Sequence, residues 1–359
     1  MRLDEVRLHQ FRNIQSAQLV GLGTSVFLIG ENGQGKTNLL EAVYLLCSGG
    51  SFRTRVDRDL VANGCNVAAV NGRFDDQGVA SQVGVAVDRT SGKAITLDGT
   101  HVRDRIQLVE RAPCIAFSHT DLEFVDGGPE RRRWYLNQTQ AMLDPLFIET
   151  HRRYRRALRA RNTLLRAQDV DQAPLYNRQL ILAGTQIQSD RGRLVAQLST
   201  VIDELFTTVA GMSNVSLRYR PSWVDGATEA ELDQRLASQL GHDLQMRTTT
   251  SGPHRDEFLL MLGGARFSAQ GSTGQRRLAA LILRVAQGRF FQQQTGRLPL
   301  LLIDDVLLEL DAEKRSQFVA NLPSSSQRFF TFLPDENYRR YAGDDTMLLR
   351  VDAGEFRAA

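Results

Sequence analysis

The chain has 359 residues, of which 42% are hydrophobic, and a formal net charge of +3. This length can bury the cores of about two or three domains, and the mild positive charge only hints at a polyanionic partner. The cysteines, Cys47, Cys65 and Cys114, have no metal-ligand spacing and cannot all pair, which argues against a disulfide-built secreted scaffold. The N-terminal segment is charged and no run approaches the roughly 20 apolar residues of a membrane span, so we expect a cytoplasmic protein.

The first elements that carry chemistry are an apolar strand at residues 26–29 and a helix at 39–46, joined by Gly30-Glu31-Asn32-Gly33-Gln34-Gly35-Lys36-Thr37. The joining segment matches the P-loop pattern G-x-x-x-x-G-K-[ST], whose glycines let backbone N–H groups surround a phosphate at a helix N-terminus. Lys36 is placed to reach the β- and γ-phosphates, and the Thr37 hydroxyl to ligate Mg²⁺. An ordinary glycine turn would not require all these positions together with both flanks. The sequence therefore predicts a nucleotide site.

From about residue 121 to 247 the pattern changes to long helical periodicity, which predicts an inserted helical domain. One apolar stripe lies on a long helix and consists of Ile187, Leu194, Leu198, Ile202, Leu205 and Val209. The segment 147–165 is the expected partner helix, because Phe147, Tyr154, Leu158 and Leu165 fall on one side of it.

Arginines gather on the other side of that partner helix, at Arg152, Arg155, Arg156 and Arg159. Few glutamates stand four residues away to balance them, so this face is either a solvated surface or a strip for DNA phosphates. A second cluster, Arg131, Arg132 and Arg133, is a further candidate for DNA binding, although Asp126 and Glu130 could simply pair with it.

Two further patterns follow the predicted insertion. A small-residue loop opens a helix at residues 278–286 and consists of Ser272, Thr273, Gly274, Gln275 and Arg276. Ser272 is a good N-cap, so the loop reads either as a second anion site or as a plain capped helix. The buried strand 300–303 then ends in Asp304 and Asp305, as in a Walker B motif. Asp304 would hold Mg²⁺, and Asp305 would orient or deprotonate an attacking water.

The order of these motifs resembles ABC-type ATPases, with 272–276 as the signature motif and Glu309 and Asp311 in a D-loop. The resemblance implies an α/β head in which the signature loop of one subunit completes the ATP site of another, so that ATP is bound within a homodimer. We expect the head at residues 1–120 and 248–359, and a helical lid at 121–247. Asp305 and Lys36 are the expected catalytic residues.

Several blocks, in order along nearly the whole chain, resemble those of the RecF family of recombination-repair ATPases, which are related to SMC heads. They are Phe11–Asn13, Gly33–Ala42, Ser51–Thr54, Glu130–Arg133, Arg161–Leu165, Gly252–Asp256 and Leu302–Val306. The resemblance implies that Arg12, Asn13 and Asn38 also lie at the ATP site. It further implies action in DNA damage repair, replication restart and the SOS response. Binding to duplex DNA next to single-strand gaps, and loading of RecA together with RecO and RecR, belong to the same expectation.

The chain departs from this family pattern at Tyr135-Leu136-Asn137 and at Leu308, which stands where a D-loop serine is usual. Asp305 is shorter than the usual glutamate, so we expect slow ATP turnover. No base-reading motif is present, which predicts DNA binding without sequence specificity. An ABC-type motor that drives another protein is the alternative, and a small-molecule phosphotransferase is disfavoured by the signature loop.

Overall fold

The computed structural model describes residues 1–359, apart from the side chain of Glu309. The chain packs as two compact units, which we describe separately: unit 1 is Met1–Asp121 with Phe291–Ala359, and unit 2 is Leu122–Phe290. The chain re-enters unit 1 after residue 290, whereas the sequence predicts a return to the head at 248. Residues 248–290 pack with unit 2 because strand β10 (Glu257–Leu262) pairs along its length with β9 (Val215–Arg220).

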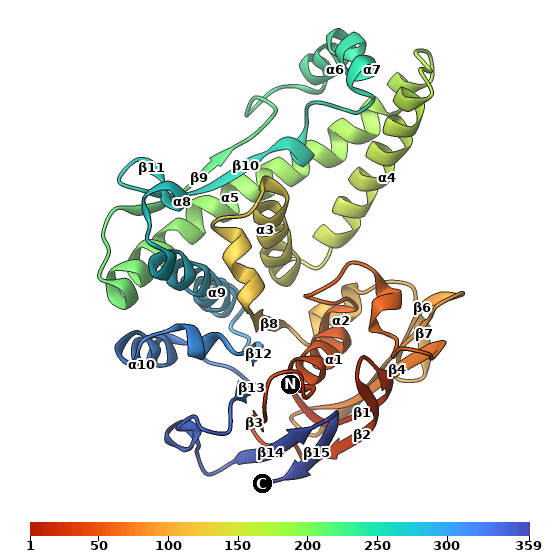
Figure 1. Cartoon of the computed structure of the whole chain (residues 1–359). Coiled ribbons are helices and arrows are strands. Elements are labelled where there is room, and N and C mark those ends of the chain that lie inside the picture. The colour runs from red at the N-terminus through yellow and green to blue at the C-terminus, as the bar shows by residue number, and fades with distance from the viewer. The chain divides into compact units, whose positions relative to one another are not determined.

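Unit 1 contains a mostly parallel sheet that carries the P-loop strand (Figure 1). Its order is β15-β14-β3-β13-β12-β8, with bounds Glu355–Ala358, Thr346–Asp352, Ser25–Ile29, Gln327–Phe332, Leu300–Ile303 and Cys114–Phe117. Strand β3 is parallel to both β13 and β14, and β12 is parallel to both β13 and β8. Strands β3, β12 and β8 are buried along their whole length, which explains their continuous apolar sequence.

A second, antiparallel sheet completes unit 1. Its order is β2-β1-β4-β5-β6-β7, with bounds Ile14–Val20, Arg2–Phe11, Val67–Asp76, Val79–Asp88, Gly92–Leu97 and Thr100–Val102. Helix α1 (Lys36–Ser48) lies between the two sheets and shares one hydrophobic core with both of them (Figure 1). The helix is buried nearly all round because its opposite faces pack against different sheets. Two shorter helices, α2 (Ile106–Arg111) and α10 (Ala312–Asn321), complete the unit.

Unit 2 is built around the long helix α5 (Asn177–Ala210). The six residues of its predicted apolar stripe are all buried, and α4 (Phe147–Arg166) packs along it as expected. The other helices are α3 (Pro129–Leu143), α6 (Glu229–Ser238), α7 (Leu240–Met246), α8 (Phe267–Gln270) and α9 (Thr273–Thr295), the last of which continues into unit 1. A small antiparallel sheet, β11-β10-β9, adds β11 (Ala265–Arg266) to the two longer strands.

Two buried ion pairs hold the interior of unit 2 together. Asp256 accepts hydrogen bonds from Arg191 (2.7 Å) and Tyr219 (2.5 Å), while Arg161 donates to Asp243 at 2.7 Å. All four charged side chains are at most 2% exposed. The sequence blocks at 161–165 and 252–256 therefore contain residues with clear packing roles.

Among the helices that the structure describes, none has the length and apolar character that a membrane crossing requires.

Candidate nucleotide site and nucleic-acid surface

The P-loop lies between β3 and α1, at the carboxyl end of the parallel sheet, where α/β folds bind ligands. Gly35 has φ of 118°, and a Cβ built on Gly30 would lie 2.3 Å from the carbonyl oxygen of Val351, so both positions require glycine. Lys36 is 3% exposed, and its Nζ donates to the carbonyl oxygens of Gly30 (2.7 Å) and Glu31 (3.1 Å). The lysine thus lies along the inside of the loop that it is expected to serve.

The turn of the β14–β15 hairpin braces the P-loop through Gln34. The backbone N–H of Gly354 donates to the Gln34 carbonyl oxygen at 2.7 Å, and that of Ala353 donates to its Oε1 at 2.7 Å. Asn13 Nδ2 donates to the same carbonyl oxygen at 3.2 Å, and Asn13 Oδ1 accepts from Asn38 Nδ2 at 2.7 Å. We call these contacts the Gln34 brace. Asn13 and Asn38, two predicted ATP-site residues, thus lie together beside the loop.

A completely buried carboxylate, Glu41, lies one helical turn beyond the start of α1. Arg12 donates to it twice, from Nε to Oε2 at 2.9 Å and from Nη2 to Oε1 at 2.8 Å. Arg53 donates from Nη1 at 3.1 Å, and Ser51 donates its hydroxyl proton. Glu41 therefore fixes Arg12 and Arg53 next to the P-loop helix, with the two guanidinium groups partly exposed.

The predicted Mg²⁺ ligands lie together. Thr37 Oγ1 donates to Asp304 Oδ1 at 2.7 Å, which joins the start of α1 to the end of β12. Burial raises the pKa of Asp304 to about 7, although the hydrogen bond from Thr37 opposes the shift. A buried carboxylate beside a hydroxyl is a pair of hard oxygen donors, which is the type of ligand that Mg²⁺ prefers, so these residues fit a Mg²⁺ ion held jointly with phosphate oxygens.

Asp305, the predicted base, follows directly and takes a left-handed backbone conformation with φ of 53°. Its N–H donates to Thr331 Oγ1 at 2.7 Å, and the same hydroxyl donates to Asp305 Oδ1 at 2.7 Å. The positive φ turns the chain away from the sheet directly after Asp304. As a result the two adjacent aspartates have different partners, Thr37 for Asp304 and Thr331 for Asp305.

The predicted signature residues begin α9 in unit 2. Ser272 caps the helix, because Gln275 N donates to Ser272 Oγ at 3.3 Å and Ser272 N donates to Gln275 Oε1 at 2.8 Å. Ser272, Thr273, Gly274 and Gln275 are exposed, whereas Arg276 is half-buried and pairs with Asp126 at 3.2 Å. The helix start is therefore capped and exposed on the surface of unit 2.

The predicted D-loop residues lie just before α10. Asp311 caps that helix by accepting from Lys314 N at 2.9 Å. Hydrogen bonding from the Lys314 side chain lowers the pKa of Asp311. Leu308 is 38% exposed, and the side chain of Glu309 lies outside the described residues.

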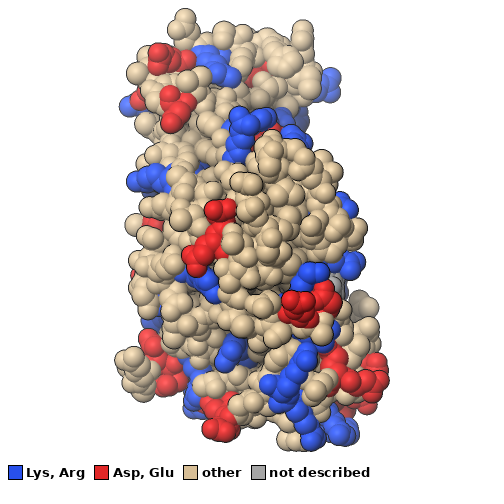
Figure 2. All heavy atoms as spheres, turned by 90° about the vertical axis from the view of Figure 1, so that its left-hand side faces the viewer, with Lys and Arg blue, Asp and Glu red and all other residues tan. Residues whose placement is uncertain are grey.

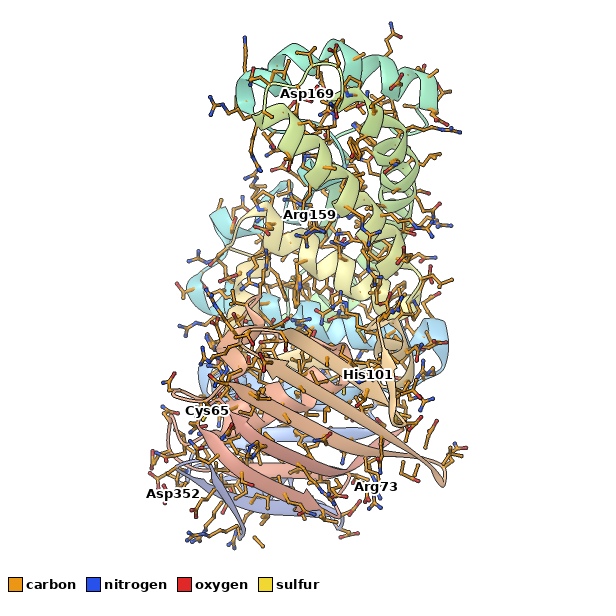
Figure 3. The ribbon with its side chains drawn as sticks, turned by 90° about the vertical axis from the view of Figure 1, so that its right-hand side faces the viewer. Cys65, Arg73, His101, Arg159, Asp169 and Asp352 are labelled. Atoms are coloured by element: carbon orange, nitrogen blue, oxygen red, sulfur yellow. The ribbon has the colours of Figure 1, made fainter. Side chains whose placement is uncertain are left out.

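The arginine strip of α4 divides into one paired residue and three unpaired ones. Arg152 forms an ion pair with Glu149 at 3.0 Å. Arg155, Arg156 and Arg159 are exposed, and no ion pair to them occurs among the described side chains (Figure 3 labels Arg159). The face drawn in Figure 2 shows basic and acidic residues interspersed instead. The three α4 residues thus form a basic surface that lacks acidic partners within the described chain.

The second predicted cluster, on α3, is engaged inside unit 2. Arg131 pairs with Glu123, Arg132 is buried and donates to the carbonyl oxygen of Gly127, and Arg133 donates to that of Asp256 at 2.9 Å. These three guanidinium groups have local structural partners. Of the two clusters, the one on α4 has the geometry that suits phosphate binding.

Four parts of the site were not given a role from the sequence: Glu41, Ser51, Thr331 and the hairpin turn 352–354. Glu41 and Ser51 stand in the blocks that resemble the RecF family, which is the signal that could have found them. Thr331 interrupts a phenylalanine-rich strand, a pattern that suggests a specific partner. The turn at 352–354 has no comparable signal.

Comparisons with known proteins agree with this architecture. Residues 2–345 match the family model described as the RecF/RecN/SMC N-terminal domain. The chain is 37% identical to the DNA replication and repair protein RecF of Treponema pallidum (strain Nichols), over 96% of this chain and 97% of that protein. It is 34% identical to RecF of Myxococcus xanthus (strain DK1622), over 99% and 97%.

Solved structures give the same result. A structure of the recombination mediator protein RecF with ATP, in the RecFOR pathway, superposes with a TM-score of 0.89 at 25% identity, over 100% of this chain and 97% of that one. An Smc head bound to the C-terminal winged-helix domain of ScpA has a TM-score of 0.56 at 14% identity, over 100% and 98%, and shows the fold alone. The chain therefore belongs to the RecF family of DNA replication and repair proteins, and its fold is that of a RecF-type ATPase of the RecF/RecN/SMC group.

Proposed function

We propose that this ATPase works as a nucleotide-gated homodimer on DNA in recombinational repair and replication restart. ATP binds at the P-loop of one subunit, and the signature residues of a second subunit contact the same ATP from the other side. Formation of the dimer brings together two arginine strips, which bind duplex DNA next to single-strand gaps. Hydrolysis of ATP then releases the dimer. Asp305 and Lys36 are the proposed catalytic residues.

The observation that carries this proposal is that the signature residues are exposed at the start of a capped helix. Ser272 to Gln275 form a capped helix start whose side chains are exposed, so the surface is ready for an external anion and uses none of its four side chains in the core of unit 2. An exposed anion-binding helix start is what a partner subunit's ATP requires. A motor ATPase or a monomeric phosphotransferase does not require a DNA-binding arginine strip on α4 of each subunit.

At the phosphates, the residues of the chain have distinct tasks. The N–H groups of the P-loop and Lys36 Nζ would bind phosphate oxygens, while Thr37 and Asp304 would hold Mg²⁺, which supplies charge neutralisation at the β- and γ-oxygens when bound. Asp305 would orient the attacking water and accept its proton. An aspartate is one methylene shorter than a glutamate, so we expect slow turnover of the kind that suits a switch.

The names of the relatives add context to the proposal. Those proteins are described as acting in DNA replication and repair, and the solved ones as recombination mediators in the RecFOR pathway. We therefore propose RecO, RecR and the recombinase RecA as partners, and the cytoplasm as the location. DNA binding would depend on charge and duplex shape without base reading, because the exposed arginines of α4 suit phosphate contacts.

Sedimentation with and without ATP and duplex DNA tests the proposal. Wild-type chains should be monomers alone and dimers with ATP. Lys36→Ala should abolish ATP binding and dimer formation together, whereas Ser272→Arg should leave ATP binding by the monomer intact and block only the dimer. An ATP-dependent dimer that persists in the Ser272→Arg variant would exclude the composite site.

A further inference from the structure

Thr331 is a buried hydroxyl residue in the middle of an aromatic strand. It is 3% exposed and lies between Phe330 and Phe332, whose rings pack on Phe27 at centroid distances of 5.4 and 5.0 Å. The backbone of β13 is hydrogen-bonded in register to β3 on one side and to β12 on the other. A hydroxyl in such surroundings is unfavourable unless it has a specific partner, and here that partner is Asp305.

The hydroxyl of Thr331 binds Asp305 at two points. Its oxygen accepts the backbone N–H of Asp305, and its proton is donated to Asp305 Oδ1, both at 2.7 Å. A hydroxyl is the side-chain group of this size that can do both at once, because it is a donor and an acceptor. The pairing of β12 with β13 ends at Ile303, so the sheet ladder itself does not fix Asp305.

Asp305 needs such a restraint because its backbone is in a costly conformation. A non-glycine residue with φ of 53° persists only where its surroundings determine it. The bond from Thr331 also distinguishes the two carboxylate oxygens, since Oδ1 accepts the hydroxyl proton whereas no hydrogen bond to Oδ2 occurs among the described side chains. The carboxylate is thereby aimed before any nucleotide binds.

We propose that Thr331 is a positioning residue for ATP hydrolysis, which aims Oδ2 of Asp305 at the attacking water. This inference rests on the proposed role of Asp305 as the base. In the step that it serves, the water oxygen forms a bond to the γ-phosphorus and the water proton passes to Asp305 Oδ2. The bond from the γ-phosphorus to the bridging oxygen breaks, and ADP leaves with that electron pair. Thr331 contacts neither the nucleotide nor the water, and acts only through Asp305.

The test compares Thr331→Val, which keeps the shape of the side chain and removes the hydroxyl, with Thr331→Ser, which keeps the hydroxyl. At saturating ATP and duplex DNA we expect kcat of Thr331→Val to fall about tenfold or more, since small errors in the geometry of a base cost rate steeply. ATP affinity, measured by equilibrium titration, should stay within about twofold. Thr331→Ser should recover most of the rate. An unchanged kcat in Thr331→Val, or a loss of ATP affinity as large as the loss of rate, overturns the inference.

Asp305→Asn separates this inference from the proposal on which it depends. If Asp305→Asn leaves kcat unchanged, the role of Asp305 is wrong and that of Thr331 fails with it. If Asp305→Asn lowers kcat and Thr331→Val does not, only the role of Thr331 is wrong. In the double variant, Thr331→Val should add no further loss, because its effect passes through Asp305. A further loss equal to that of the single variant contradicts the inference. Should Thr331→Val not fold, as judged by thermal unfolding, Thr331→Ala replaces it in the same comparison.

Discussion

Glu41 shows, at the scale of single residues, how this fold buries a full negative charge. The carboxylate is 0% exposed, and Arg12, Arg53 and Ser51 all donate to it. A buried carboxylate with several charged donors is stable only as a group, because each missing partner leaves the others with an unmet charge. The arrangement also joins three segments, near residues 12, 41 and 53, around the start of α1.

Replacement of this carboxylate by an amide should therefore be costly. Glu41→Gln should lower the free energy of unfolding by about 2 kcal/mol, since charge-assisted hydrogen bonds to two arginines become neutral ones. Urea unfolding measures the change. Glu355→Gln is the matched control in the same unit, because Glu355 pairs with Arg357 on an exposed strand and should cost well under about 1 kcal/mol. Equal effects of the two substitutions would contradict a special role for Glu41.

We predict that the free energy of unfolding depends on pH through the buried side chain of His254. Its Nδ1 lies 2.6 Å from the hydroxyl of Tyr154 and its Nε2 lies 2.8 Å from the carbonyl oxygen of Thr249, an arrangement that suits a neutral ring. Burial lowers the pKa of His254 from 6.5 to about 4. The pKa of His254 is lower in the folded protein than in the unfolded chain, so protons bind preferentially to the unfolded chain as the pH falls. The stability that the neutral His254 ring contributes is therefore fully present above pH 6.5 and is lost as the pH falls toward 4.

When the pH is lowered from 7 to 5, the preferential protonation of His254 in the unfolded chain should lower the free energy of unfolding by about 2 kcal/mol. The measurement is denaturant unfolding of wild type and His254→Gln across this range. The glutamine variant lacks the titrating group, so its stability should fall less over the same interval. Parallel pH profiles for the two proteins would show that His254 is not the group responsible.

At the scale of elements, the turn of the β14–β15 hairpin supports the P-loop, which is distant from it in sequence. Gly354 has φ of 84°, and a Cβ there would lie 2.6 Å from the carbonyl oxygen of Asn13. Gly354→Ala should therefore displace the turn, weaken the Gln34 brace and reduce ATP affinity about tenfold, as nucleotide titration would measure. Gly21→Ala is the control, since Gly21 has φ of 69° with no atom within 4 Å of its Cβ position. A similar loss in both variants would point to general backbone strain.

Helix α4 supplies the prediction about DNA. Reversal of Arg155, Arg156 and Arg159 to glutamate should weaken binding to duplex DNA and lower the slope of log affinity against log salt by about three, since each lost phosphate contact removes roughly one counterion. The matched control reverses Arg178, Arg193 and Arg220, exposed arginines of the same unit that already pair with acidic residues. An unchanged slope in the α4 variant would remove this helix from the DNA surface.

The sequence predicted those elements whose signal is local. The P-loop, the strand 300–303, the helix start at Ser272 and the apolar stripe of α5 all follow from periodicity or from a short motif. The sequence predicts a return to the head at 248, whereas residues 248–290 pack with unit 2, because the pairing of β9 with β10 joins segments that are distant in sequence. The Gln34 brace and the contact of Thr331 with Asp305 were missed for the same reason, since each depends on which strands lie side by side.

For the whole molecule, the proposed dimer predicts that two inactive variants can complement each other. A mixed dimer of Lys36→Ala with Ser272→Arg contains one ATP site with an intact lysine from one subunit and an intact signature serine from the other. Mixing the two inactive proteins should therefore restore part of the DNA-stimulated ATPase activity, measured by phosphate release. Each variant assayed alone, at the same total protein concentration, is the control. No recovery at any mixing ratio would argue against a shared site.

The position of β3 in the parallel sheet has a consequence for the order of folding. Both strands that flank the P-loop strand, β13 and β14, come from residues 327–352, and the turn that braces Gln34 follows them directly. During synthesis β3 therefore stays without its sheet neighbours until the ribosome has passed this region, whereas the antiparallel pairing of β1 with β2 can form early. Nucleotide binding should thus be acquired late, so that a nascent chain cannot capture ATP, and join a second chain, before its own helical unit has been made.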